Sequence, residues 1–352
     1  MKGLIFALLI FTSTYILKAQ ADVPYIEEEI SVYSTMEVTL SGTLTLPPGT
    51  GPFPCAILIT GSGPQDRNEE LFGHKPFEAI AHGLAAEGIA TIRMDDRGVG
   101  KSTGDFSKAT SLDFANDIQR VFKYASQDKR LLPNKIGLIG HSEGGMIAPI
   151  VASRNPNIAF VISLAGTGVP GREVLRQQNY DIYIASGGTK EQAQGASNNI
   201  VRFLDIVKNN TDSTTCADKL TIALDSALAD QKGLIPDWNE FLKYQIGFLT
   251  SPWMRFFAEH DPAEDWKLVK CPVLALNGEK DIQVNPNQNL PAISAALDAG
   301  KNYNYEMTIM NGMNHLFQRC VLCTVDEYAH LPESISPDVI LEMGNWVNKK
   351  VR

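Results

Sequence analysis

The fold is decided by one stretch of the chain, Ile136-Gly137-Leu138-Ile139-Gly140-His141-Ser142-Glu143-Gly144-Gly145. It opens as a continuous apolar run, which is typical of a strand covered on both faces, and it continues into a predicted helix over residues 144–153. A sharp turn from strand to helix projects the side chain at the turn above the edge of the sheet, provided that the residues two before and two after it are small. Gly140 and Gly144 meet that condition, so Ser142 is the candidate nucleophile.

Strands and helices alternate on both sides of this stretch. Further buried strands are predicted over residues 55–60, 90–94, 160–164, 272–276 and 303–310, and further helices over residues 76–86, 112–125, 287–297 and 337–347. Residues 29–47 instead alternate apolar and polar side chains, which favours two antiparallel strands at a sheet edge. This alternation of strands and helices predicts an α/β fold, with a mostly parallel sheet flanked by helices on both faces.

The alternation stops between residues 170 and 262. This segment has helical patterns but no convincing buried strand, so we expect a helical lid inserted into a core made of residues 22–169 and 263–352. Several aromatic side chains fall within it: Trp238, Phe241, Tyr244, Phe248, Trp253, Phe256 and Phe257. Their partly helical spacing favours packing of the lid onto the core, and a subset is expected to line an apolar pocket.

The N-terminus has the pattern of an export signal. Lys2 precedes an apolar run over residues 4–17, and Ala19-Gln20-Ala21 fits the small-x-small rule for cleavage. The run is interrupted by polar residues and is shorter than the ~20 apolar residues of a membrane anchor. We therefore expect residues 1–21 to be a signal peptide, the mature protein to be periplasmic or extracellular in a bacterium, and no membrane span to remain after cleavage.

Composition and charge narrow the class of protein. Hydrophobic residues make up 44% of the 352 residues and charged residues 20%, as in an ordinary globular enzyme. The formal net charge of −9 opposes binding to phosphate backbones, so nucleic acid is not an expected partner. Nothing in the sequence indicates the oligomeric state.

The five cysteines are an odd number, so at least one has no partner within the chain. Cys55 and Cys271 fall in strand-like apolar runs and are expected to be buried. Cys320 and Cys323 form a C-x-x-C in a loop-like stretch, where a local disulfide is the simplest interpretation for an exported protein. Zinc would need further ligands at suitable spacing, which the sequence does not offer, so no metal site is expected.

A serine hydroxyl is a weak nucleophile unless a base takes its proton. Of the six histidines, His315 is the best placed, because it lies in a glycine-containing loop directly after the last predicted strand. His141 is next to Ser142, so its side chain is expected to point away. The base in turn needs an orienting carboxylate, for which Asp281 is the leading candidate and Glu279 the second. The order Ser142, Asp281, His315 is the one expected for a serine hydrolase on this kind of sheet.

The negative charge that develops on a substrate oxygen needs backbone N–H donors. One is expected from Glu143, which follows the nucleophile and opens a helix whose dipole favours an anion. The other is expected from the glycine-containing turn after the strand at residues 55–60, with Ser62 preferred and Gly63 the second choice.

Two arginines lie near these motifs. Arg97 follows the strand at residues 90–94 and is expected to be tied to a nearby carboxylate such as Asp66. The alternative is that Arg67 or Arg97 binds a carboxylate of the substrate.

Several stretches resemble the α/β-hydrolase superfamily, namely Gly61-Ser62-Gly63-Pro64-Gln65-Asp66-Arg67, Asp96-Arg97-Gly98-Val99-Gly100-Lys101-Ser102, the turn at residues 140–145, Gly278-Glu279-Lys280-Asp281 and Asn314-His315-Leu316-Phe317-Gln318. More narrowly, they resemble secreted bacterial carboxylesterases related to the serine aminopeptidase and prolyl oligopeptidase branches. The resemblance spans residues 30–350. It implies an eight-stranded, mostly parallel sheet with a helical lid, no cofactor, and hydrolysis of a small-molecule ester or a related acyl compound. The C-x-x-C after His315 departs from the family pattern.

Two alternatives to an esterase remain open. A serine peptidase or aminopeptidase, acting on short peptides or aminoacyl substrates, would have to hold a substrate amine or an extended backbone, for which the lid offers the acids Glu240, Glu259, Asp261 and Glu264. A catalytically silent binding protein on the same fold is the other alternative, and the complete serine, acid and histidine order argues against it.

Overall fold

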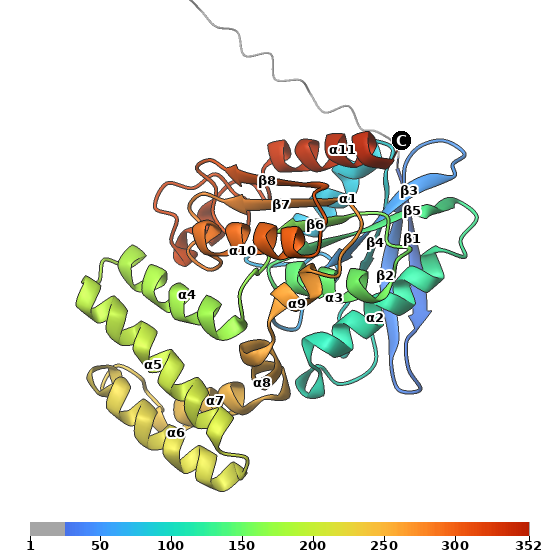
Figure 1. Cartoon of the computed structure of the whole chain (residues 1–352). Coiled ribbons are helices and arrows are strands. Elements are labelled where there is room, and N and C mark those ends of the chain that lie inside the picture. Colours follow the sequence, from blue (N-terminus) through green and yellow to red (C-terminus); the bar gives the residue numbers. More distant parts are fainter. Residues whose placement is uncertain (1–24, 352) are drawn as a thin grey trace, which may run out of the picture.

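An eight-stranded sheet with the strand order β1-β2-β4-β3-β5-β6-β7-β8 lies at the centre of the computed structural model, which describes residues 25–351 (Figure 1). Its strands are β1 (Ile26–Tyr33), β2 (Thr39–Leu46), β3 (Phe53–Ile59), β4 (Ala90–Met94), β5 (Leu131–His141), β6 (Val161–Leu164), β7 (Val273–Gly278) and β8 (Tyr305–Met310). β2 pairs antiparallel with both β1 and β4, and the remaining neighbours run parallel. The mostly parallel sheet with an antiparallel pair at one edge is thereby confirmed. The predicted signal peptide, residues 1–21, lies outside the described residues.

Most side chains of the central strands are apolar and buried, which fits the helices that cover both faces of the sheet. In β5, Leu138 packs into the core on one face and Ile139 into the core on the other. Helices α2 (Ser111–Ala125), α3 (Glu143–Arg154) and α10 (Pro286–Ala299) cover the first face, and α1 (Pro76–Ala86) and α11 (Pro337–Val351) cover the second (Figure 1). Successive side chains of a strand point to opposite faces, so a strand buried on both sides has no position for a solvated polar residue.

Short sequence signals set the ends of these helices. Thr110 caps α2 in a reciprocal arrangement, in which its hydroxyl accepts from the Asp113 N–H and the Asp113 carboxylate accepts from the Thr110 N–H. Pro76 and Pro286 stand at the first turns of α1 and α10, where a missing N–H costs nothing. The predicted bounds of the core helices therefore agree with the observed ones to within a few residues.

The chain between β6 and β7, all of it described, is helical and adds no strand to the sheet. The helices are α4 (Gly171–Ala185), α5 (Lys190–Asn209), α6 (Ser213–Ala227), α7 (Trp238–Thr250), α8 (Pro252–Glu259) and α9 (Pro262–Trp266). We call α4–α8 the cap segment; it lies to one side of the sheet, at the lower left of Figure 1. Buried residues of α5, α6, α7 and α8 form a core of their own, apart from the two cores that sandwich the sheet. Within residues 25–351, no helix combines the length and the hydropathy that a bilayer span requires.

Candidate active site

Ser142 lies at the sharp turn between β5 and α3. Its backbone has φ 53° and ψ −115°, a left-handed conformation that is strained for a residue with a Cβ atom. The turn is tight enough that a Cβ atom at Gly140 would collide with the Gly144 carbonyl, and one at Gly144 with the Ile59 carbonyl. The Ser142 N–H donates to the Leu164 carbonyl of β6 at 2.8 Å, which fixes the turn against the neighbouring strand. The spacing of glycines around Ser142 thus has the steric reason that the sequence pattern suggests.

His315 and Asp281 meet at the same edge of the sheet, beyond the ends of β8 and β7. His315 Nδ1 lies 2.8 Å from Asp281 Oδ2, and both side chains are buried. Asp281 also accepts hydrogen bonds from the side-chain amide of Asn277 and from the backbone N–H groups of Gln283 and Val284. These donors hold the carboxylate in one orientation, and the carboxylate in turn holds the imidazole.

The second-choice acid, Glu279, lies elsewhere in the same loop. Its carboxylate accepts from the backbone N–H of Gly312 at 2.9 Å and pairs with Lys280, both in exposed positions. It makes no hydrogen bond with His315 among those found in residues 25–351. Of the two candidates, Asp281 is therefore the one that contacts the imidazole.

Ser142 and His315 line one cavity of about 270 Å³, which side chains of the cap segment also line. Its apolar lining comes mostly from the cap segment and from the residue after His315, namely Val174, Leu175, Phe248, Trp253, Phe257 and Leu316. The rings of Trp253 and Phe257, which both line the cavity, stack on each other with their centroids 5.0 Å apart. No lysine or arginine of the described residues lines the cavity. Three of the aromatic residues of the predicted lid, Phe248, Trp253 and Phe257, thus line a pocket, as a subset was expected to do.

The predicted oxyanion donors lie close to Ser142. Ser62, in the loop after β3, and Glu143 both line the cavity. Glu143 is the first residue of α3, so its N–H has no acceptor within the helix and lies at the positive end of the helix dipole. Gly63 follows Ser62 with φ 94° and is not among the residues that line the cavity.

The side chain of Glu143 has contacts that the sequence did not suggest. It is 2% exposed, and one carboxylate oxygen accepts from the Ser111 hydroxyl at 2.7 Å and from the Trp253 indole N–H at 2.8 Å. Burial raises the pKa of Glu143 above its ordinary value, and the hydrogen bonds from Ser111 and Trp253 offset part of that rise. One buried carboxyl group therefore joins α3 to α2 and to the cap segment.

Replacing Glu143 by glutamine is expected to flatten the dependence of stability on pH. At low pH the carboxyl is protonated in both the folded and the unfolded state. As the pH rises past the unfolded-state pKa, the unfolded chain ionises first, so the wild type loses stability relative to Glu143→Gln by about 1.4 kcal/mol per unit of pKa difference. Urea unfolding between about pH 4 and 8 measures this slope. The exposed Glu240→Gln is the control, and a difference between wild type and Glu143→Gln that is constant with pH would contradict the assignment.

A second buried acid, Glu69, was not predicted at all. It is 5% exposed and has φ 51°, and its Oε1 accepts from the Gly61 N–H at 2.6 Å and lies 3.0 Å from His141 Nδ1. His141 Nε2 lies 3.0 Å from the backbone carbonyl of His315, and the two rings are 4.8 Å apart. Burial alone lowers the pKa of His141, but the charge of Glu69 and the hydrogen bonds to Glu69 and His315 raise it above its ordinary value. The expectation that the His141 side chain simply points away was incomplete, because it turns toward the loop that carries His315.

The two arginines are committed to structural ion pairs. Arg97 pairs with Asp117 at 2.8 Å, not with Asp66 as predicted, because Asp117 of α2 faces the turn after β4 whereas Asp66 accepts N–H groups within its own loop. Arg67 pairs with Asp95 at 2.8 Å and with Glu29 at 2.7 Å. Neither arginine lines the cavity, so neither is placed to bind a substrate carboxylate there.

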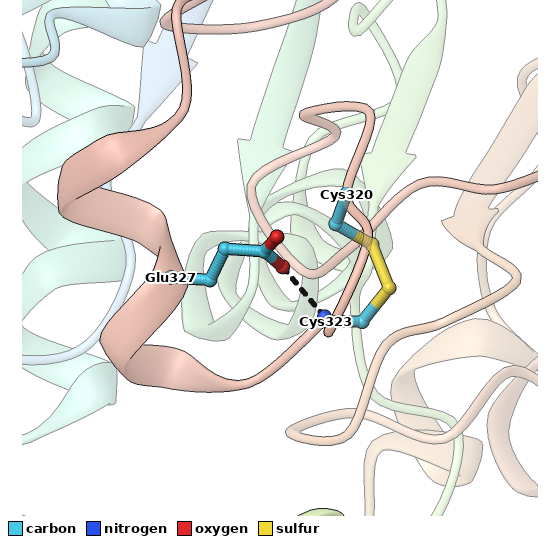
Figure 2. A group of neighbouring side chains, drawn as sticks. All are labelled: Cys320, Cys323 and Glu327. Carbon is cyan, nitrogen blue, oxygen red and sulfur yellow. Dashed lines mark hydrogen bonds between the residues drawn. A yellow bond between two sulfur atoms is a disulfide. The ribbon is translucent and has the colours of Figure 1, made fainter.

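Cys320 and Cys323 form a disulfide in the loop that follows His315 (Figure 2). Glu327, on the helical turn that follows them in the chain, accepts the backbone N–H groups of Leu322 and Cys323, the bond to Cys323 being the one drawn in Figure 2. The three remaining cysteines, Cys55, Cys216 and Cys271, are free thiols. The Cys320 N–H donates to the Gly312 carbonyl, which ties the cross-linked turn to the start of the His315 loop.

Removing this disulfide is expected to destabilise the protein modestly. The cross-link spans a sequence separation of 3, and a loop this short restricts the unfolded chain by about 2 kcal/mol. The measurement is the free energy of urea unfolding of the double variant Cys320→Ser/Cys323→Ser. A thiol reductant should bring the wild type to the same value and leave the double variant unchanged; equal stability of oxidised wild type and variant would be the contrary result.

Comparisons with known proteins place the chain in a family and identify relatives. A family model described as X-Pro dipeptidyl-peptidase (S15 family) matches residues 24–316. Esterase EstD of Thermotoga maritima is 26% identical over 279 residues, which are 79% of this chain but 58% of that protein, so the chain spans less than two thirds of this relative. An uncharacterized 31.7 kDa protein of Escherichia coli is 24% identical over 236 residues, 64% of this chain and 74% of that protein.

Solved structures resemble the chain along most of its length. A Pyrococcus furiosus esterase, Pf2001, superposes with a TM-score of 0.58 at 14% identity and covers 94% of each chain. DcsB, in complex with its substrate analogue, superposes with a TM-score of 0.56 at 15% identity, covering 93% of this chain and 99% of that one. At these identities the similarity establishes the fold alone.

Proposed function

The chain belongs to the X-Pro dipeptidyl-peptidase (S15) family and has the α/β-hydrolase fold, and on that premise we propose that it is a serine hydrolase that cleaves carboxylic esters. The observation that carries the proposal is the cavity shared by Ser142 and His315, with His315 Nδ1 held 2.8 Å from Asp281. The esterase relative and the esterase structure support the same chemistry.

The mechanism is a two-step acyl transfer. His315 Nε2 takes the proton of Ser142 as the serine oxygen attacks the ester carbonyl, while Asp281 fixes the tautomer and orientation of the imidazole. The N–H groups of Glu143 and of Ser62, with Gly63 as the alternative to Ser62, hold the oxyanion of the tetrahedral intermediate. His315 then protonates the leaving alcohol and activates the water that releases the acyl group from Ser142.

The cavity favours an uncharged acyl group. Its wall of aliphatic and aromatic side chains lowers the free energy of an apolar acyl chain or ring, and no lysine or arginine of the described residues lines it to hold a carboxylate. A cavity of about 270 Å³ suits a short or medium acyl chain or a single aromatic ring. The stacked Trp253 and Phe257 rings offer a surface for such a ring.

Peptide hydrolysis is the second candidate, because the family takes its description from a peptidase. An aminopeptidase needs a carboxylate free to bind the substrate ammonium group. The two acids that line the cavity, Glu69 and Glu143, are both buried, and each is bonded to groups of the protein itself. The cap acids named as alternatives, Glu240, Glu259, Asp261 and Glu264, do not line the cavity. These contacts favour the ester over the peptide.

A substrate panel separates the two candidates. We expect kcat/KM for p-nitrophenyl butyrate and p-nitrophenyl benzoate to exceed that for Gly-Pro p-nitroanilide by more than about 1,000-fold, since ester substrates need no amine recognition. Hydrolysis of the Xaa-Pro amide at a rate equal to that of the esters would assign a peptidase instead. Failure of a fluorophosphonate to label Ser142 would point to a silent binding protein.

We also propose that the protein is exported. The basic residue and apolar run at the N-terminus, the Ala19-Gln20-Ala21 site and the Cys320–Cys323 disulfide all suit an oxidising compartment outside the cytoplasm. Mass spectrometry of the N-terminal peptide from a periplasmic or culture fraction tests this proposal. A mature chain that begins at Asp22 is the expected result, and an intact chain retained in the cytoplasm would contradict it.

A further inference from the structure

Glu69 and His141 lie between the two loops on which the proposed chemistry depends. The Glu69 carboxylate binds the Gly61 N–H, at the start of the loop that carries Ser62. His141 contacts Glu69 through Nδ1 and the carbonyl of His315 through Nε2. A continuous chain of hydrogen bonds therefore runs from the oxyanion loop, through a carboxylate and an imidazole, to the backbone of the residue proposed as the base.

The partners of His141 determine how many protons Glu69 and His141 hold together. The carbonyl of His315 can only accept, and Glu69 Oε1 already accepts from the Gly61 N–H. A neutral imidazole has a single N–H, which cannot satisfy two acceptors. Glu69 and His141 must then share one additional proton, as an imidazolium with a carboxylate or as an imidazole with a carboxylic acid. Either form has no net charge, which suits a pair in which the residues are 5% and 6% exposed.

The backbone of Glu69 is strained, which indicates that its position is held by its contacts. A positive φ of 51° is uncommon for a residue with a long side chain, and such conformations persist where the surrounding structure overdetermines them. The carboxylate of Glu69, fixed by Gly61 and His141, supplies that constraint. An exposed loop acid would adopt a relaxed conformation instead.

We propose that Glu69 and His141 are a positioning pair that sets the distance between the oxyanion loop and the catalytic histidine. The pair acts through the backbone of Gly61 and of His315, and it takes no part in proton transfer to or from the substrate. The proposal rests on the proposed function of Ser142 and His315. The pair is therefore expected to stabilise the transition state, because the oxyanion donors and the base must contact the same substrate at the same time.

Two variants of His141 separate positioning from packing. In His141→Gln the side-chain amide nitrogen reaches the place of Nε2 and can still donate to the His315 carbonyl. In His141→Asn it reaches only the place of Nδ1 and can donate to Glu69 alone. We expect His141→Asn to lose about 100-fold in kcat with KM changed less than about threefold, and His141→Gln to recover most of that loss, because misplacement of catalytic groups by about 1 Å has an effect of this size.

The experiment uses the full mature chain with p-nitrophenyl butyrate, and it includes the rate of labelling of Ser142 by a fluorophosphonate. Labelling by this reagent requires the serine, the base and the oxyanion donors, but it does not depend on which substrate the enzyme prefers. If the wild type labels but does not hydrolyse esters, the proposed function fails, while the labelling rates of the variants still test the pair. His82→Asn, on the outer side of α1, is the control and is expected to match the wild type.

Two results would overturn the proposal. One is an equal loss of kcat in His141→Asn and His141→Gln, and the other is a loss that appears in KM or only in the thermal midpoint. If His141→Asn does not fold, Glu69→Ala tests the same hydrogen-bonded network by removing its carboxylate. We expect Glu69→Ala combined with His141→Asn to cost no more in kcat than the worse single variant, because the two residues act as one unit. Additive losses would show that they act separately.

Discussion

Ser142→Ala is expected to lower kcat for p-nitrophenyl butyrate on the order of a millionfold, to the residual rate given by binding and the oxyanion donors alone. The alanine methyl group occupies the place of the serine Cβ at the same strained turn, so the fold and the cavity should be unchanged. Steady-state hydrolysis of the aryl ester and labelling by a fluorophosphonate measure the two consequences, which are loss of turnover and loss of covalent adduct.

The matched control for this variant is Ser294→Ala on α10. The Ser294 hydroxyl donates to a carbonyl of its own helix, and the residue does not line the cavity. It should keep wild-type activity and labelling. If Ser142→Ala retained wild-type hydrolysis, the nucleophile would have to be another residue and the proposed mechanism would be lost.

Asp281→Asn is expected to lower kcat by about 10,000-fold with little change in KM. An amide cannot accept the His315 Nδ1–H and at the same time satisfy the N–H groups of Gln283 and Val284, which the carboxylate now does. The imidazole is then held in the wrong tautomer, with its proton on the nitrogen that should receive one from Ser142. The profile of kcat against pH, together with KM, tests this effect.

Glu279→Gln is the control for the acid, since it changes the neighbouring carboxylate in the same loop. Glu279 binds Gly312 and Lys280 and does not touch His315, so its variant should retain kcat within about twofold. Comparable losses in Asp281→Asn and Glu279→Gln would mean that the loop as a whole, and no single carboxylate, orients the histidine.

Much of this site could be predicted because its parts stand at the ends of strands. Apolar runs such as those of β5 and β7 locate a parallel sheet, and residues that follow parallel strands meet at one edge of it. Ser142, Asp281 and His315 each follow such a run. The order of residues in the sequence was therefore sufficient to predict that all three lie at one edge of the sheet, where Asp281 contacts His315 and where Ser142 and His315 line one cavity.

The residues that were missed have no comparable pattern. Glu69 lies in an irregular loop, where a charged residue is ordinarily solvated, and only the fold buries it against His141. The bond between Glu143 and Trp253 joins residues 110 apart in the chain, across the boundary between the core and the cap segment. The partner of Arg97 was misjudged for the same reason, because the choice between Asp66 and Asp117 depends on how α2 packs.

The hydrogen bond from Trp253 to Glu143 links the position of α8 to the surroundings of Ser142. Trp253 belongs to α8, and the carboxyl that it binds belongs to the residue whose N–H opens α3 beside Ser142. Any swing of α8 away from the sheet removes the indole from that carboxyl and leaves a buried acid short of a donor. Because indole fluorescence responds to a neighbouring carboxyl group, the emission of Trp253 would report any such displacement of α8 when a substrate binds.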